Sequence, residues 1–137
     1  MVERGGRVHT RPIANVRGNT LKAVILANVD KSANIYTDEY RTYRSIGKNF
    51  ASHQTVNHSR HEYVRGNVTS NTVESFFAIL KRGINGIYHS VSKEHLHRYM
   101  SEFQFRYNHR KLSDGERTQA AIRCADGKRL TYRECVR

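Results

Sequence analysis

Residues 34–47 read Asn-Ile-Tyr-Thr-Asp-Glu-Tyr-Arg-Thr-Tyr-Arg-Ser-Ile-Gly, and they hold the pattern that decides the fold class. The run Asn34–Thr37 predicts a short strand that stops at the acidic pair Asp38-Glu39. Residues 40–46 then predict a turn of helix, which Gly47 breaks. A strand that leads directly into a helix is typical of α/β proteins, so we expect an α/β layer architecture.

The segment before this unit predicts two short strands and a helix. Gly5-Gly6 separates two apolar-polar stretches, which we interpret as the end of one strand, a turn, and a second strand over residues 8–13. Asn19 is a candidate cap for the helix that follows. The apolar side chains of that helix recur at helical spacing: Leu21, Val24 and Ile25.

The segment after it predicts one more strand and three helices. Residues 52–58 alternate as a strand does, and residues 59–70 predict a loop or a loose hairpin. Asn71 opens a helix that ends at Gly83 after two basic residues, a typical stop. Ser92 is the expected cap of the longest helix, and a shorter helix covers residues 116–125. Apolar stripes mark the first two of these helices: Val73, Phe76, Phe77 and Leu80, then Leu96, Tyr99, Met100, Phe103 and Tyr107.

The charge balance indicates a polyanionic partner. The 137 residues contain 24 Lys and Arg against 12 Asp and Glu, a formal net charge of +12. Nucleic acid is the usual partner of such a basic domain. No apolar run approaches the roughly 18 residues of a membrane span, and the N-terminus lacks a signal-peptide core, so we expect a cytoplasmic protein with no membrane partner. Cys124 and Cys135 are expected to be reduced thiols, and the histidine spacings do not complete a zinc site.

Two carboxylates are the candidates for chemistry. Asp38 follows a strand, where an acid can reach a ligand at the carboxyl edge of the sheet; it can equally be an ordinary turn aspartate. Glu74 lies on the helix that begins at Asn71, seven residues before Lys81. Two helical turns place Glu74 and Lys81 on nearly one stripe, about 10 Å apart. The alternative is a capping box between Asn71 and Glu74, with Lys81 and Arg82 complementing the helix dipole.

Several stretches, taken in order, closely resemble the ISXO-like group of insertion-sequence transposases, which belong to the DDE superfamily. The resemblance covers residues 1–108 and is loose beyond residue 111. The stretches that carry it are Tyr36-Thr37-Asp38-Glu39-Tyr40, Val56-Asn57-His58-Ser59, Glu62-Tyr63-Val64-Arg65-Gly66, Asn71-Thr72-Val73-Glu74-Ser75-Phe76-Phe77, Leu80-Lys81-Arg82-Gly83, Tyr88-His89, residues 92–99, Glu102-Phe103 and Arg106-Tyr107-Asn108.

The resemblance implies a fold, a site and partners. It implies a ribonuclease H-like mixed sheet with flanking helices, a catalytic core over residues 1–110, and a C-terminal helix and basic tail over residues 111–137. Asp38 corresponds to the second catalytic acid and Glu74 to the third, both as Mg²⁺ ligands, and Lys81 to a basic catalytic residue that touches DNA. The implied partners are insertion-sequence ends and target DNA, with Arg65, Lys81 and Arg82 as the DNA-binding residues. Two shared Mg²⁺ ions about 4 Å apart require the two carboxylates to lie within about 8 Å of each other.

The chain departs from the family pattern at its beginning. Family members carry the first catalytic Asp on an opening strand that precedes the segment matched here, and neither Glu3 nor Asp30 suits that role. We therefore expect a core truncated at the N-terminus, with the first strand missing, that binds DNA without cutting it unaided. A non-catalytic DNA-binding remnant or regulator of an insertion sequence is the alternative, and a basic RNA-associated protein is a weaker one. The sequence leaves open whether the chain forms a homo-oligomer.

Overall fold

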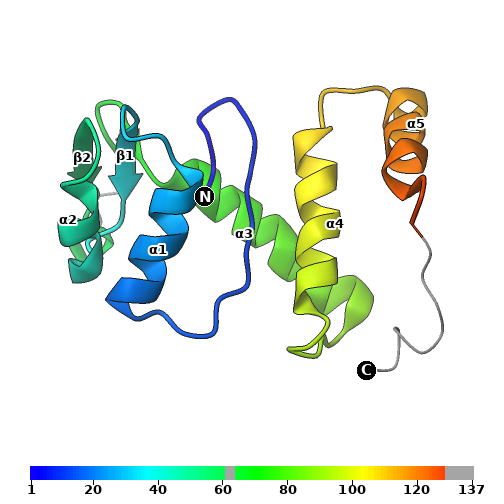
Figure 1. Ribbon diagram of the computed structural model, residues 1–137, viewed down its shortest axis with the longest axis horizontal. Helices are drawn as coiled ribbons and strands as arrows, with labels where there is room; N and C mark the ends of the chain where they lie inside the picture. Colours follow the sequence, from blue (N-terminus) through cyan, green and yellow to red (C-terminus); the bar gives the residue numbers. More distant parts are fainter. Residues whose placement is uncertain (61–63, 129–137) are drawn as a thin grey trace.

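The computed structural model describes residues 1–60 and 64–128. Helices alternate with short strands along these residues, so the predicted α/β class is confirmed (Figure 1). The elements in chain order are α1 (Gly18–Asn28), β1 (Asn34–Thr37), α2 (Arg41–Gly47), β2 (Ser52–Thr55), the 3₁₀ turn η1 (His58–Arg60), β3 (Val64–Arg65), β4 (Val68–Thr69), α3 (Asn71–Gly83), the π-helical turn η2 (Ile84–Tyr88), α4 (Leu96–Asn108) and α5 (Asp114–Ala125).

The strands form two separate pairs, where the sequence analysis expected one mixed sheet. β1 and β2 are parallel, with Asn34 opposite Ser52 and Thr37 opposite Thr55, and α2 makes the crossover that parallel strands require. β3 and β4 form the hairpin expected after residue 59, and Gly66 supplies the positive φ of +58° at its turn. β4 contacts β1 and β2, and among the described strands it is hydrogen-bonded to β3.

The N-terminal hairpin, defined here as residues 1–10, begins as predicted but its pairing is shorter. Val2 and Val8 form an antiparallel bridge around Gly5, whose φ is +69°, and His9 N donates to Met1 O at 2.9 Å, but residues 10–13 of the expected strand have no strand partner among the described residues. Side chains of α4 take that place. Asn108 accepts from Val8 N at 2.7 Å and donates to Val8 O at 3.0 Å, and Gln104 accepts from Thr10 N at 2.7 Å. The backbone of this segment is therefore satisfied by helix amides.

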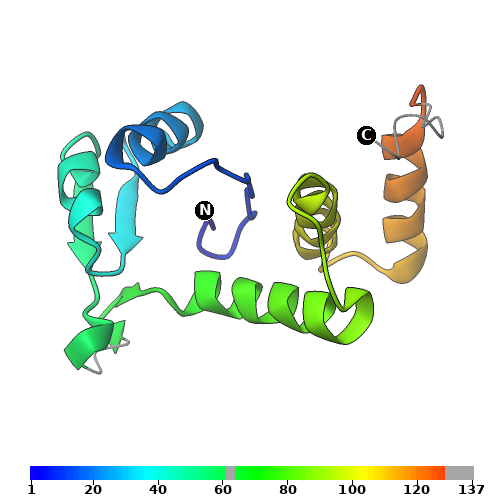
Figure 2. The ribbon, with the colours of Figure 1, turned by 90° about the horizontal axis from the view of Figure 1, so that it is seen from below.

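The main core lies where this hairpin packs against α3 and α4 (Figure 2). The predicted stripes supply it, since Phe76 and Leu80 from α3 meet Phe103 from α4 and Val8 from the hairpin, all at most 8% exposed. Phe76 also packs edge-to-face on Tyr107, with ring centroids 5.6 Å apart. Phe77 departs from the prediction and is 46% exposed, because it points away from the face that carries Phe76 and Leu80.

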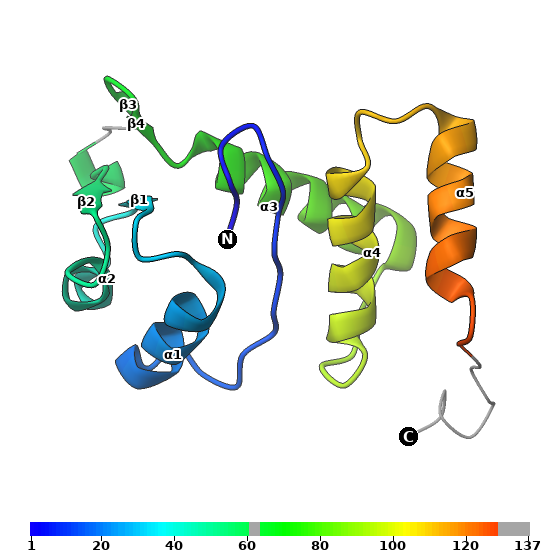
Figure 3. The same ribbon diagram turned by 45° about the horizontal axis from the view of Figure 1, so that its top comes forward.

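Helix α3 connects the two sides of the molecule. Figure 3 shows the β1–α2–β2 unit and the β3–β4 hairpin near its first turn, and α4 beside its C-terminal half. A second set of buried side chains, Ile46, Val56 and Val68, belongs to the strand side. Arg4 links the hairpin to that side: its guanidinium lies 4.8 Å from the Tyr36 ring centroid and donates to the Asn67 carbonyl.

Three helix starts differ from the predicted caps. α1 begins at Gly18, and Asn15 rather than Asn19 accepts the hydrogen bonds of its first turn. α4 begins at Leu96, four residues after Ser92. α5 begins at Asp114, two residues earlier than expected, because Ser113 and Glu116 form a complete capping box.

Helix α5 lies beyond α4 and has no buried residue, and the division of the chain at residue 110 stays a prediction. Cys124, on α5, is a free exposed thiol, whereas Cys135 lies outside the described residues. No helix in residues 1–60 or 64–128 is long and apolar enough to cross a membrane.

Candidate active site

Asp38 lies directly after β1, at the carboxyl edge of the parallel pair, and is exposed. Its Oδ1 accepts a hydrogen bond from Tyr40 N at 3.1 Å, which is the turn geometry that the alternative interpretation predicted. A carboxylate has two oxygens, and the turn uses only one of them. The turn bond therefore fixes the direction of Asp38 and leaves Oδ2 able to accept a further ligand.

Glu74 lies in the first turn of α3, and its side chain is 49% exposed. The capping box with Asn71 is not formed, because α3 begins at Asn71 and the N-cap residue is Ser70. Glu74 is therefore one residue too late for the capping position. Instead, the Ser70 hydroxyl donates a short hydrogen bond to Glu74 Oε1. Glu74 is held by a side chain and does not cap the backbone.

His58 joins this pair of residues from the loop that follows β2. Its Nε2 lies 2.9 Å from Ser70 Oγ and 3.3 Å from Glu74 Oε1. Val56, two residues earlier, is 1% exposed and fixes the start of the loop. The imidazole thus ties the end of the parallel pair to the first turn of α3.

Glu39, next to Asp38, holds the backbone of the same loop. Its carboxylate accepts from His58 N and Ser59 N, both at 3.1 Å, and from Ser59 Oγ at 2.6 Å. These bonds, the Ser59 hydroxyl first, lower the pKa of Glu39 to about 2 from its ordinary 4.5. Glu39 thereby joins the turn after β1, which carries Asp38, to the loop after β2, whose His58 contacts Glu74.

The sequence analysis did not single out Glu39, His58 or Ser70 as site residues. A signal for two of them was present, because Glu39 and His58 both follow strands shortly after their carboxyl ends. Parallel neighbours end on the same edge, so residues after both strands are expected to meet there. The contact with Ser70 carries no local signal, since it depends on where the β3–β4 hairpin returns the chain.

The three basic candidates lie in different surroundings. Lys81 is exposed on α3, two turns after Glu74, and makes no ion pair within the described part of the chain. Arg82 lines a hollow of about 470 Å³ between α3 and α4, together with Arg106 and Arg110. Arg65 donates to the Thr55 carbonyl at 2.7 Å and so also secures the end of β2.

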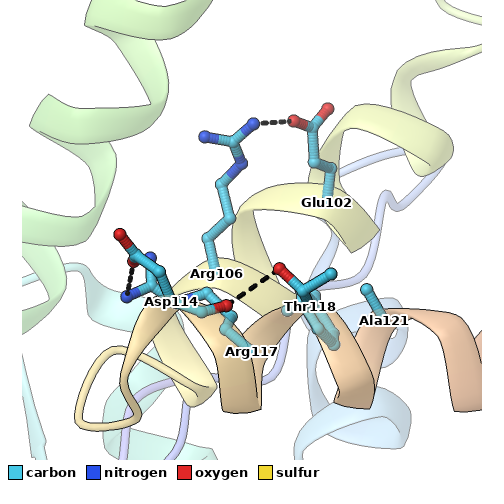
Figure 4. Close-up of a pocket in the computed structure, with 7 residues that line it drawn as sticks. Glu102, Arg106, Asp114, Arg117, Thr118 and Ala121 are labelled. Atoms are coloured by element: carbon cyan, nitrogen blue, oxygen red, sulfur yellow. Dashed lines mark hydrogen bonds and ion pairs between the residues drawn. The ribbon is translucent and has the colours of Figure 1, made fainter.

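A second hollow of about 400 Å³ separates α4 from α5 (Figure 4). Its charged side chains are paired locally, Arg106 with Glu102 at 2.8 Å and Arg117 with Asp114 at 3.2 Å. Neither hollow is lined by Asp38 or Glu74. Both carboxylates are exposed, Asp38 after β1 and Glu74 in the first turn of α3.

Residues 1–108 match the ISXO2-like transposase domain. The chain belongs to the ISXO2-like transposase family. It is 28% identical over 106 residues to an uncharacterized transposase-like protein of Haemophilus influenzae, covering 77% of this chain and 85% of that protein. It is 30% identical over 108 residues to an uncharacterized protein in the transposable element ISH50 of Halobacterium salinarum, again covering 77% of this chain. The match spans only 36% of the Halobacterium protein, and no solved structure matches the chain.

Membership of the ISXO2-like transposase family assigns the chain a role in transposition and implies an interaction with DNA. The matched range contains all of β1 to α4, and so includes Asp38, Glu39, His58, Ser70 and Glu74. Helix α5 lies outside the matched range. The edge that these residues form is thus part of the transposase domain.

Proposed function

We propose that the chain is part of the catalytic core of a DDE-type transposase, with a ribonuclease H-like arrangement of its strands. Asp38 and Glu74 are two acids of a metal-dependent site for DNA strand cleavage and transfer, and Lys81 is the basic residue beside them. The observation that carries the proposal is the contact of His58 with Glu74 at 3.3 Å, from a loop that Glu39 holds. This contact links the strand edge that bears Asp38 to the helix that bears Glu74.

The donor set suits Mg²⁺ in kind. Carboxylate oxygens are the ligands that Mg²⁺ prefers, and it commonly takes only one or two from the protein, with water and phosphate completing the shell. The described residues hold no group of three or more metal-ligating side chains, so the proposal rests on Asp38 and Glu74 alone. A bound pair of ions would supply charge stabilisation at the attacking and leaving oxygens of a phosphodiester.

Other residues of the chain orient the two acids and contact the DNA phosphates in this proposal. Glu74 is oriented by Ser70 and His58, and Asp38 by its turn bond to Tyr40 N. Lys81, two helical turns from Glu74, reaches the next phosphate along a strand and offsets its charge. Arg65, on β3 before α3, and Arg82, in the last turn of α3, are the further phosphate contacts of this proposal. DNA ends and target DNA are the substrates of this proposal.

The two acids do not complete the site of a DDE enzyme. Neither Glu3 nor Asp30 is proposed as a third: Glu3 lies in the turn of the N-terminal hairpin, where it accepts from Arg7 N, and Asp30 precedes β1, at the opposite end of that strand from Asp38. With one carboxylate fewer, the charge developing on a reacting oxygen loses its stabilisation, which is usually the largest catalytic term. The 137-residue chain is therefore expected to bind DNA without nicking it.

The test is a nicking assay on supercoiled DNA and on element-end duplexes, with Mg²⁺ or Mn²⁺. Glu74→Gln is the matched control, since it keeps the shape and removes the charge. The expected result is binding by both proteins and nicking by neither. Nicking by the wild-type chain that disappears in Glu74→Gln supports the site and refutes the argument that two acids are too few. Nicking that persists in Glu74→Gln contradicts the assignment of Glu74.

A further inference from the structure

The direction of the hydrogen bonds around Glu74 can be worked out from their partners. A serine hydroxyl has one proton, and Ser70 gives it to Glu74 Oε1. The same hydroxyl must therefore accept at its 2.9 Å contact with His58, so the imidazole proton is on Nε2. That N–H also lies 3.3 Å from Glu74 Oε1. Two donors thus converge on one carboxylate oxygen, and Oε2 has no partner in the described part of the chain.

The backbone that carries the His58 imidazole is held in place. Glu39 accepts both backbone N–H groups of residues 58 and 59, and Val56 is buried just before them. Glu74, in contrast, is half exposed on the first turn of a helix, where a glutamate side chain would otherwise sample several rotamers. The ordered partner is His58, and the group that gains order from the contact is the Glu74 carboxylate.

We propose that His58 is a positioning residue that, directly and through Ser70, holds Oε1 of Glu74 and so leaves Oε2 to bind a divalent cation. The proposal rests on the proposed function of Glu74 as a metal ligand. Donors that occupy Oε1 alone leave Oε2 able to accept a ligand, and such partners of a metal-binding carboxylate set its direction and its affinity. His58 does not touch the cation in this arrangement.

His53 and His97 provide comparisons. The ring of His53 contacts Thr37 Oγ1 at 2.9 Å, which ties β2 to β1 and involves no carboxylate. His97 is exposed on α4, and its substitution removes a histidine without affecting the strand edge. His58 is thus distinguished by its contact with Glu74.

The experiment uses the ¹⁵N-labelled 137-residue chain and Mn²⁺ alone as the probe, so that its readout does not depend on activity. Paramagnetic broadening of the backbone amides of residues 38–39 and 71–75 is followed as Mn²⁺ is added. His58→Leu and Ser70→Ala are expected to weaken the broadening at residues 71–75 by about tenfold or more in Mn²⁺ concentration, the usual effect of losing such a partner. His58→Gln, which keeps an N–H near the Nε2 position, is expected to restore it, and His97→Leu is the matched control.

The outcomes separate the two proposals. If Glu74→Gln abolishes the broadening at residues 71–75 while His58→Leu and Ser70→Ala leave it unchanged, the positioning role is refuted and the function of Glu74 stands. Equal loss in His58→Gln and His58→Leu also refutes it, because the restored N–H would then have no effect. If Glu74→Gln leaves the broadening unchanged, the proposed function fails, and this inference fails with it. Should His58→Leu lose its native amide spectrum, Ser70→Ala decides, since it removes only the bridging hydroxyl.

Discussion

The packing of α3 against α4 predicts that Gly83→Ala destabilises the protein. Gly83 has helical dihedral angles, φ −64° and ψ −46°, so alanine fits its backbone and would gain about 1 kcal/mol in helix propensity. The side chain does not fit the space. An added Cβ would lie 2.1 Å from Cζ and 2.9 Å from Cε1 of Phe103. Phe103 is 8% exposed and packs edge-to-face on Tyr88, so its ring has little room to move.

The size of the effect follows from these opposing contributions. Overpacking a core costs about 1–3 kcal/mol, and so close an approach belongs at the upper end. After the propensity gain of about 1 kcal/mol, the net loss in the free energy of unfolding is about 2 kcal/mol. Equilibrium urea unfolding measures it, with Gly86→Ala as the matched control, because a Cβ at Gly86 meets nothing within 4 Å.

A second variant tests the cause. Combining Gly83→Ala with Phe103→Leu removes the clashing ring atoms, so the double variant is expected to lose less than the sum of the two single losses. Gly83→Ala that is as stable as the wild-type chain, or more stable, would refute the packing argument. Strict additivity of the two substitutions would show that the loss has another origin.

Two further predictions concern DNA binding and pH. Lys81→Ala is expected to weaken duplex binding across all sequences and to reduce the slope of log K against log[salt] by about 1. Lys22→Ala on α1 is the charge-matched control. An unchanged slope for Lys81→Ala in a salt titration contradicts the phosphate contact. Hydrogen bonds from the side chain and then the backbone of Ser113 lower the pKa of Glu116 below its ordinary 4.5, so the capping box stabilises α5 above that pH and loses this contribution as the pH falls through the lowered value. Amide exchange in α5 measures this loss, and a pH response that persists in Ser113→Ala would contradict it.

The helices were more predictable than the strand pairing. The bounds of α3 follow from its stripe of Phe76 and Leu80 and from the stop at Gly83, all of which are local. The expected strand over residues 8–13 was right in its pairing at Val8 and wrong in its length, because Asn108 and Gln104 of α4 supply its other hydrogen bonds. Those partners lie more than 90 positions away along the chain, and the pattern of apolar and polar residues within the segment does not indicate them.

The candidate acids could be chosen from the sequence, whereas the residues that contact them could not. Asp38 and Glu74 could be selected because one ends a strand and the other shares a helical stripe with Lys81. The Ser70 hydroxyl and the His58 ring contact Glu74 only because the chain turns at Gly66 and brings residue 70 back beside residue 58. The distance between Asp38 and Glu74 stays a prediction.

Helix α3 separates the stability of the fold from the geometry of the site. Its buried face, with Phe76, Leu80 and Gly83, packs on the hairpin and α4, whereas Glu74 and Lys81 are exposed. Gly83 is nine residues from Glu74, or roughly 14 Å along the axis. Substitutions at Gly83 should therefore lower stability while Mn²⁺ broadening at residues 71–75 persists in the folded fraction. Substitution of His58 should have the opposite effect: the broadening weakens and the stability persists. The contacts of His58 orient a carboxylate and bury no part of the α3–α4 core.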